Sequence, residues 1–351
     1  MSVLAIFIDP MNPNNWRPEE RPSMERHFGP IVEIGPDINW LDAVNKYKPD
    51  TLFWRLDGEK TPRWFWEQAM LVSTLLTDNK FYRQINNPHG WINVHCKDEA
   101  FRQWTDHGFS CPDWFSFDTR EDFYRKRNGM KTSFLLRIND GNTGEGSYLV
   151  NTEDELEKAL DESFAVDLTA KYGPGVNRTR VVSKFYDHVK YGYRYSIRVV
   201  VCGDKVIVGY ARLSNPDDWV AIEEKFTESM APAWIKLQKE AEKFCKKHEA
   251  ELVGAVHALG LNWQGMDLVM DDDGQHYSLE VQPDYLCGTP LSSDGLPWYY
   301  PGPTNCPGLF QWLVDNRTFV EKKLPYFYHN WLDKANMFDL CHKEMKRYLS
   351  D

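Results

Sequence analysis

Hydrophobic and polar residues alternate along the first 92 positions in stretches typical of short strands and helices. The apolar runs at 3–8 and 51–54 predict buried strands, and the patterns at 40–47 and 61–76 predict helices. Strands that alternate with helices favour a small parallel α/β unit. The turn-forming cluster at 86–90 interrupts this pattern, so we place the end of the N-terminal unit at residue 92.

A glycine-rich loop dominates the next stretch, residues 93–185. A short helix is expected at 96–107, where Lys97, Phe101 and Trp104 recur at helical spacing. Strands at 133–137 and 147–150 flank the loop at 139–146, which predicts a hairpin. The glycine loops of Walker and Rossmann sites open into helices instead. A capping box, Thr152 to Glu155, begins a helix that ends near residue 162.

Residues 186–295 carry the polar positions with the clearest chemistry. Strands at 180–186, 195–201 and 206–211 precede an amphipathic helix at 232–259, which ends at Gly260. Two further strands then form a hairpin that presents Asp267, Glu280 and Gln282 at one end. Oxygen donors of this kind suit Mg²⁺, which completes its coordination shell with phosphates. The hairpin therefore predicts a nucleotide-handling metal site.

The tail, residues 296–351, combines Pro/Gly loops with helix-like stretches at 309–323 and 330–349. It either covers the active site or forms a homodimer interface, and the sequence leaves both arrangements open.

Composition narrows the classes of function. With 351 residues, 42% apolar and 26% charged, the chain has the composition of a globular protein of several domains. Its net charge of −11 and lack of a basic block exclude a nucleic-acid partner. No apolar run is long enough to span a membrane or to form a secretory signal.

Seven cysteines without metal-ligand spacing indicate reduced thiols in a cytoplasmic protein. The ten histidines are dispersed, and no nucleophile triad is discernible.

In the order of these elements the chain resembles the ATP-grasp superfamily over roughly residues 80–290, with the hairpin Gly-Met-Asp…Leu-Glu-Val-Gln-Pro as the most specific segment. The paired arginines Arg198 and Arg212 look like those of the RimK-like, glutamate-ligase branch. The resemblance implies an α/β fold of three parts. These are a small parallel pre-ATP-grasp domain, a glycine-loop lid subdomain and a C-terminal metal-bearing antiparallel sheet.

The resemblance also implies roles for individual residues. ATP would be bound by the phosphate-contacting residues Lys97, Arg137, Gly141, Gly144 and Gly146, and by the adenine hinge Ser183, Lys184 and Phe185. Asp267, Glu280 and Gln282 would hold one or two Mg²⁺ ions, with Mn²⁺ as an alternative. Arg198 and Arg212 would act in catalysis, on the transferred phosphoryl group and the acceptor. Three positions depart from the usual family residue: Arg137 replaces Lys, Lys184 replaces Glu and Gln282 replaces Asn.

Most of the superfamily are carboxylate–amine ligases. The resemblance therefore implies that ATP activates a small-molecule or peptide carboxylate as an acyl phosphate, which an amine attacks, releasing ADP and phosphate. Two alternatives remain open: a kinase that phosphorylates a small-molecule hydroxyl, and a degenerate nucleotide-binding protein. Substrate contacts are expected from Asp284 and Tyr285, and from Arg55, Arg63 and the aromatic residues at 64–66, although a place in the core fits these aromatic residues equally well.

Overall fold

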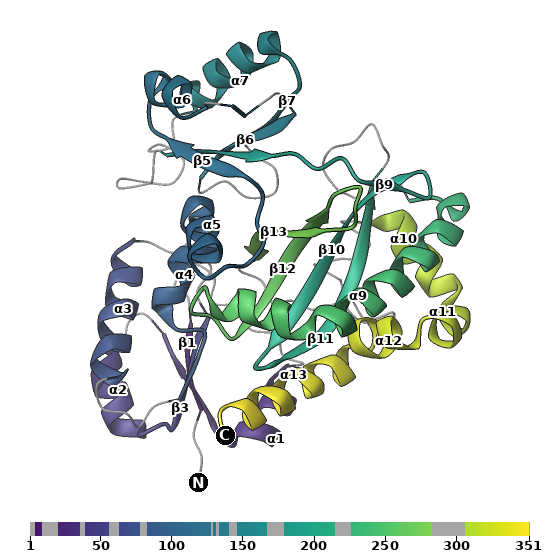
Figure 1. The fold of residues 1–351 in the computed structure, drawn as a ribbon. Coiled ribbons are helices and arrows are strands. Elements are labelled where there is room, and N and C mark those ends of the chain that lie inside the picture. Colours follow the sequence, from purple (N-terminus) through teal and green to yellow (C-terminus); the bar gives the residue numbers. More distant parts are fainter. Residues whose placement is uncertain are drawn as a thin grey trace.

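The structure is a computed structural model, and it describes residues 4–8, 20–35, 39–55, 63–77, 83–127, 129–130, 133–139, 146–166, 179–214, 226–282 and 306–350. Three sheets make up its framework, and helices lie on and between them (Figure 1).

The N-terminal unit is a four-stranded parallel sheet, which confirms the predicted parallel α/β unit. Its strand order is β2-β1-β3-β4, with β1 (Leu4–Ile8), β2 (Ile31–Ile34), β3 (Thr51–Arg55) and β4 (Arg83–Ile85). Its helices are α1 (Glu20–Phe28), α2 (Trp40–Tyr47) and α3 (Arg63–Thr77). The pattern analysis missed α1, because this polar helix buries only two apolar side chains, Met24 and Phe28. It also missed the short strands β2 and β4.

At residues 86–90, where a boundary was expected, the chain makes hydrogen bonds to the central sheet and then enters a helix. Asn86 has a positive φ of 55°, and its side-chain amide donates to the carbonyl oxygen of Trp263 at 2.8 Å. The amide N–H of Trp263 donates back to the Asn86 side chain at 3.0 Å. Helix α4 (Pro88–His95) begins immediately afterwards. A Cβ added to its Gly90 would lie 2.6 Å from the carbonyl oxygen of Gly260, so this glycine permits close backbone contact.

The lid sheet is antiparallel, with the order β5-β8-β6-β7, and lies at the top of the molecule in Figure 1. Its strands are β5 (Trp114–Phe117), β6 (Phe134–Ile138), β7 (Ser147–Val150) and β8 (Arg180–Lys184), and α5 (Lys97–Asp106), α6 (Arg120–Lys126) and α7 (Glu153–Ala165) adjoin it. The antiparallel pairing of β6 with β7 confirms the predicted hairpin. The capping box at Thr152 is confirmed in both of its hydrogen bonds.

The central sheet carries the predicted metal hairpin. Its strands are β9 (Val189–Lys190), β10 (Tyr193–Cys202), β11 (Lys205–Ser214), β12 (Trp263–Met270) and β13 (His276–Gln282). The strand order is β11-β10-β12-β13, and β9 pairs with β10. The long helix α9 (Ala231–His257) crosses one face of this sheet (Figure 1). It lies close to β11, because the side-chain amide of Gln238 exchanges two hydrogen bonds with the backbone of Ala211.

Strand β13 contains a β-bulge, which changes the side chains that share a face of the sheet. Asp267 pairs with Glu280, whereas the next residue of β12, Leu268, pairs with Ser278, so Leu279 is the extra residue of a β-bulge. Because side chains alternate between faces with a period of two, the bulge reverses the alternation on either side of Leu279. Glu280 therefore shares the face of Asp267, while Ser278 and His276 share the opposite face, toward α9.

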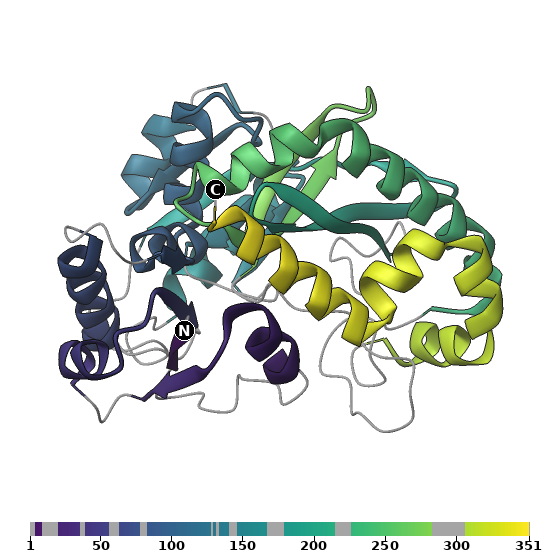
Figure 2. The ribbon, with the colours of Figure 1, turned by 90° about the horizontal axis from the view of Figure 1, so that it is seen from below.

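The C-terminal helices return the chain to the N-terminal unit (Figure 2). They are α10 (Pro307–Asp315), α11 (Arg317–Lys323), α12 (Pro325–Phe327), the π-helical turn η3 (Tyr328–Leu332) and α13 (Lys334–Tyr348). Asp339 of α13 accepts hydrogen bonds from Arg26 and His27 of α1, and the carbonyl oxygen of Cys341 accepts from the Cys202 thiol on β10. The tail thus joins the N-terminal unit to the central sheet. Its role in a homodimer stays a prediction.

Among the described residues, no helix is long and apolar enough to span a membrane.

The contact between α9 and β11 at Gly209 predicts a pair-dependent effect on stability. A Cβ added at Gly209 would lie only 2.0 Å from the Cys245 sulfur, so we expect Gly209→Ala to lower the free energy of unfolding by about 1–3 kcal/mol. Adding Cys245→Ala removes the clashing sulfur, and the double variant should be more stable than the sum of the single effects predicts. Urea unfolding of all four proteins measures this coupling, and strictly additive effects would contradict the packing described here.

Candidate active site

The register of the central sheet places four predicted residues on one face. Arg198 of β10 pairs directly with Asp267 of β12, which pairs with Glu280 of β13. On the other side of Arg198, β11 pairs with β10 so that Arg212 lies opposite Ser196, two residues from Arg198. Since residues two apart share a face, Arg198, Arg212, Asp267 and Glu280 form one cluster on the face that points away from α9.

Arg198 and Asp267 form a two-pronged ion pair at the centre of this cluster. The Arg198 Nε and Nη2 atoms each donate to one Asp267 carboxylate oxygen at 2.6 Å. Arg212 Nη1 lies 3.7 Å from the same carboxylate. Burial alone would lower the pKa of Arg198, but the combined effects of Asp267, Tyr210 and Glu280, with Asp267 the largest among them, outweigh it and raise that pKa. The pair therefore stays charged and fixes the orientation of the Arg198 guanidinium.

Arg137 enters the cluster from the end of β6, in the lid sheet. Its Nη1 lies 3.8 Å from Glu280 Oε2, and its Nη2 donates to the Ser183 hydroxyl at 3.2 Å. The side chain is only 5% exposed, and its buried Nε–H has no hydrogen-bond acceptor among the described residues. Burial lowers the pKa of Arg137, and Glu280 opposes that shift only in part. A buried guanidinium with an unsatisfied donor is suited to an anionic ligand.

Lys97 lies at the first position of α5 and is 7% exposed. Its ammonium group donates to the backbone carbonyl of Asn139 at 3.4 Å, just beyond β6. The Asn139 side chain accepts from the amide of Asp98 at 2.9 Å and donates to the Asp98 carboxylate at 2.6 Å. Asn139 thus ties the start of the glycine loop to the start of α5. The sequence analysis gave it no role, because its partner Asp98 lies 41 positions earlier in the chain.

The predicted hinge residues lie at the end of β8 and just beyond it. Ser183 is fully buried and is the partner of Arg137. The amide N–H groups of Lys184 and Phe185 donate to the carbonyls of Asp113 and Ser133, at 2.9 and 3.1 Å. The Lys184 side chain is exposed, and its ammonium lies 4.9 Å from the centre of the Tyr186 ring.

Tyr186 and Tyr277 lie beside the predicted hinge, and the sequence analysis assigned neither of them a role. The rings of Tyr186 and Tyr277 stack with their centres 4.2 Å apart, and the Tyr277 hydroxyl donates to Asp271 at 2.9 Å. Tyr277 pairs with Val269, two residues from Asp267, so it lies on the same face as the charged cluster. The position of Tyr186 directly after the hinge was the available signal, but its partner is 91 residues away in the sequence.

The remaining predicted residues are only partly described. Gly146 has a φ of +64°, and a Cβ there would lie 2.3 Å from the Ile138 side chain, so a glycine is required. Gln282 ends β13 opposite Gly265, and its side chain lies outside the described atoms. Outside the described residues or side chains lie Gly141, Gly144, Asp284, Tyr285, Arg55, Arg63 and the aromatic residues at 64–66.

The charges of the cluster fit a metal-bound phosphate chain. Among these six described groups, the cations Lys97, Arg137, Arg198 and Arg212 outnumber the carboxylates Asp267 and Glu280 by two, and half of the six are buried. An anion with several oxygens would balance this excess and satisfy the Arg137 Nε–H. The two carboxylates lie opposite each other on neighbouring strands and offer the oxygen donors that Mg²⁺ prefers. The residues present therefore fit both groups.

No protein-family model matches the chain, and no curated protein sequence matches it. Among solved structures, the chain is similar to D-alanine–D-alanine ligase from Bacillus anthracis, with a TM-score of 0.51 and 17% identity over 81% of this chain and 87% of that one. The same ligase complexed with ATP has a TM-score of 0.51 at 16% identity, and the match covers 100% of this chain and 96% of that one. A RimK domain ATP-grasp protein from Sphaerobacter thermophilus DSM 20745 matches over the full length of both chains, at 14% identity and a TM-score of 0.49.

These similarities concern the fold, and they agree with the three-part architecture described above. The parallel N-terminal unit, the antiparallel lid sheet and the central sheet with its carboxylate hairpin together confirm the resemblance drawn from the sequence. The chain has the ATP-grasp fold.

Proposed function

We propose that this chain is an ATP-dependent ligase that joins a carboxylate to an amine. The observation that carries the proposal is the convergence of lid and central sheet on one buried charge, Arg137, which contacts Glu280 and whose Nε–H has no acceptor in the part of the chain that the structure describes. The likeness in fold to a ligase complexed with ATP supports a nucleotide as the missing anion. The oxygen-only donors Asp267 and Glu280 support Mg²⁺, as one or two ions, with Gln282 as a further ligand and Mn²⁺ as an alternative.

The protein's own groups bind and orient the reactants. Lys97 and Arg137 contact phosphate oxygens, while the backbone around Gly141, Gly144 and Gly146 approaches them closely. Ser183, Lys184 and Phe185 border the adenine, with the stacked Tyr186 and Tyr277 beside them. Mg²⁺, when bound, neutralises part of the phosphate charge. The main contributions of the protein are position and electrostatic stabilisation, as in other phosphoryl transfers.

The reaction proceeds in two steps. A carboxylate oxygen of the first substrate attacks the terminal phosphorus of ATP, the bond to the bridging oxygen breaks, and ADP leaves. The amine of the second substrate then attacks the carbonyl carbon of the acyl phosphate; phosphate leaves, and the nitrogen loses a proton. Arg198, oriented by Asp267, stabilises the transferred phosphoryl group, and Arg212 holds the acceptor carboxylate. The substrates are a small-molecule or peptide carboxylate and an amine.

Product mass tests this assignment. The full chain is incubated with Mg-ATP and a pool of amino acids, small peptides and other carboxylates, with and without added amines. A product whose mass equals two pool members less one water supports the ligase and names both substrates. A product that gains only a phosphoryl group assigns the chain to the kinases. Nucleotide binding without any product assigns it to the degenerate binding proteins.

Removing one metal-binding carboxylate should abolish turnover without unfolding the chain. We expect Glu280→Gln to lower kcat by at least about 100-fold, because a neutral amide binds Mg²⁺ weakly. Asp273→Asn is the matched control, since Asp273 lies exposed in the turn of the same hairpin and should leave kcat unchanged. ADP release at saturating Mg-ATP measures both, and equal rates for Glu280→Gln and the wild type would rule out Glu280 as a metal ligand.

Arg137 should contribute directly to nucleotide affinity. Arg137→Met removes a buried charge-assisted contact, so we expect the Kd for ATP to rise by about 10- to 100-fold. Arg137→Lys should recover only part of this affinity, because a lysine lacks the planar guanidinium fork. The control is Arg125→Met, on α6 of the lid, whose guanidinium contacts only the Asp122 carboxylate in the described structure. Calorimetric titration with a non-hydrolysable ATP analogue makes the comparison; unchanged affinity in Arg137→Met refutes the phosphate contact.

A further inference from the structure

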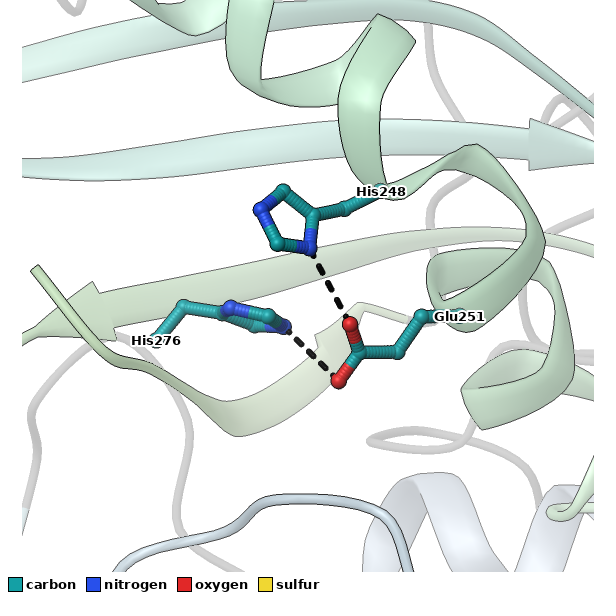
Figure 3. Close-up of side chains that lie close together, drawn as sticks. All are labelled: His248, Glu251 and His276. Atoms are coloured by element: carbon teal, nitrogen blue, oxygen red, sulfur yellow. Dashed lines mark hydrogen bonds and ion pairs between the residues drawn. The ribbon is translucent and has the colours of Figure 1, made fainter.

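A second cluster of ligand-type side chains lies on the α9 face of the central sheet, away from Asp267 and Glu280. His248 and Glu251 of α9 converge on His276, the first residue of β13 (Figure 3). His248 Nδ1 lies 3.1 Å from Glu251 Oε2, and His276 Nε2 lies 3.2 Å from Glu251 Oε1. One ligand atom from each residue can be chosen so that all three lie within 4.8 Å of one another.

The fold brings these residues together for identifiable reasons. The bulge at Leu279 turns His276 toward α9, since it pairs with Met270 on that face of the sheet. His248 and Glu251 are three residues apart, which places them on the same side of a helix. The backbone of α9 departs from helical geometry at His248, where φ is −108° and ψ is 15°. The helix resumes at once and carries Glu251.

An aromatic side chain holds both rings in place. The Phe244 ring stacks on the His248 ring, with ring centres 4.7 Å apart. It is nearly perpendicular to the His276 ring, with ring centres 5.0 Å apart. His276 is 5% exposed, whereas the side chains of His248 and Glu251 are 24% and 39% exposed. The cluster is therefore ordered by packing on its inner side and open to solvent on its outer side. The exposed side gives an ion a path from solvent to the cluster.

The donor set identifies the class of ion. Two imidazole nitrogens and one carboxylate oxygen suit Zn²⁺ and its neighbours Co²⁺ and Ni²⁺, whereas Mg²⁺ prefers oxygen alone. Ligand atoms in a tetrahedral zinc site lie about 3.3 Å apart, as follows from bond lengths of about 2.0–2.1 Å. The two nitrogen–oxygen distances, 3.1 and 3.2 Å, are close to this spacing, and each runs to a different oxygen of the Glu251 carboxylate.

We propose that His248, Glu251 and His276 bind a divalent transition-metal ion, with zinc as the best fit, in a structural site distinct from the nucleotide face. The ion lies between His248 Nδ1, His276 Nε2 and the Glu251 carboxylate, and each neutral imidazole carries its one proton on the ring nitrogen that faces away from the ion. It links α9 to the start of β13, the strand that carries Glu280 four residues later. The site therefore stabilises the hairpin on which the candidate active site is built, and it does so whether or not the chain is a ligase.

A competition titration tests the site. The full chain, freed of metal with a chelator, is titrated with Zn²⁺ against a chromophoric chelator in millimolar Mg²⁺, which occupies the oxygen-only site. We expect one zinc per chain with a Kd below about 1 µM, and a loss of at least about 100-fold in affinity in His276→Asn and in Glu251→Gln. The control is His107→Asn, because His107 is exposed at the end of α5 and should leave zinc binding unchanged.

Thermal unfolding supplies a second, independent measurement. Zinc should raise the unfolding midpoint of the wild type and of His107→Asn but not of the two ligand variants, since an ion bound only by the folded state stabilises it. Glu251→Gln keeps the shape of the side chain, so it tests the site even if His276→Asn fails to fold. Zinc affinity that is equal in the wild type and Glu251→Gln, or wild-type binding only above about 100 µM, would overturn the proposal.

Discussion

The candidate active site depends on the pairing register between β12 and β13. Asp267 pairs with Glu280 only because Leu279 is accommodated as an extra residue, and without the bulge Glu280 and His276 would share one face. The bulge allows a single strand to place a carboxylate on the face of Asp267, where we propose that the nucleotide binds, and an imidazole on the face toward α9. Both donor sets, oxygen-only and nitrogen-rich, follow from this one irregularity.

The second constraint is the cost of burying charge. Arg137 of the lid sheet meets Glu280 of the central sheet, beside the two-pronged ion pair of Arg198 and Asp267. Removing either partner of such a pair would leave an uncompensated buried charge, which is strongly destabilising. The excess positive charge instead favours an anionic ligand. The electrostatic arrangement that makes the unliganded site costly would thus supply the affinity for phosphate that we propose.

The sequence was most informative where a pattern is local. The long helix at 232–259, the glycine hairpin and the capping box at Thr152 each depend on residues close together in the chain, and the structure has all three. Helix α1 and strand β4 escaped prediction, because one is polar and the other has three residues. The pattern of residues around 265–283 also indicated the carboxylate hairpin, since Asp267 and Glu280 occupy neighbouring predicted strands.

Contacts between distant segments could not be predicted in this way. Nothing local to Tyr186 indicates that it stacks on Tyr277, and nothing near His248 indicates that His276 lies beside it. The ten histidines looked dispersed because the Leu279 bulge, which turns one of them toward α9, leaves no mark in the alternation of residues. Asn139 was hidden for a similar reason, since its partner Asp98 lies 41 positions earlier.

The most direct test of the proposed site is a crystal structure of the chain with Mn²⁺ and a non-hydrolysable ATP analogue. The account predicts an anomalous manganese peak between the carboxylates of Asp267 and Glu280, and a phosphate oxygen within hydrogen-bonding distance of the Arg137 guanidinium. Manganese and nucleotide bound elsewhere, with the Arg137 Nε–H still lacking an acceptor, would contradict it.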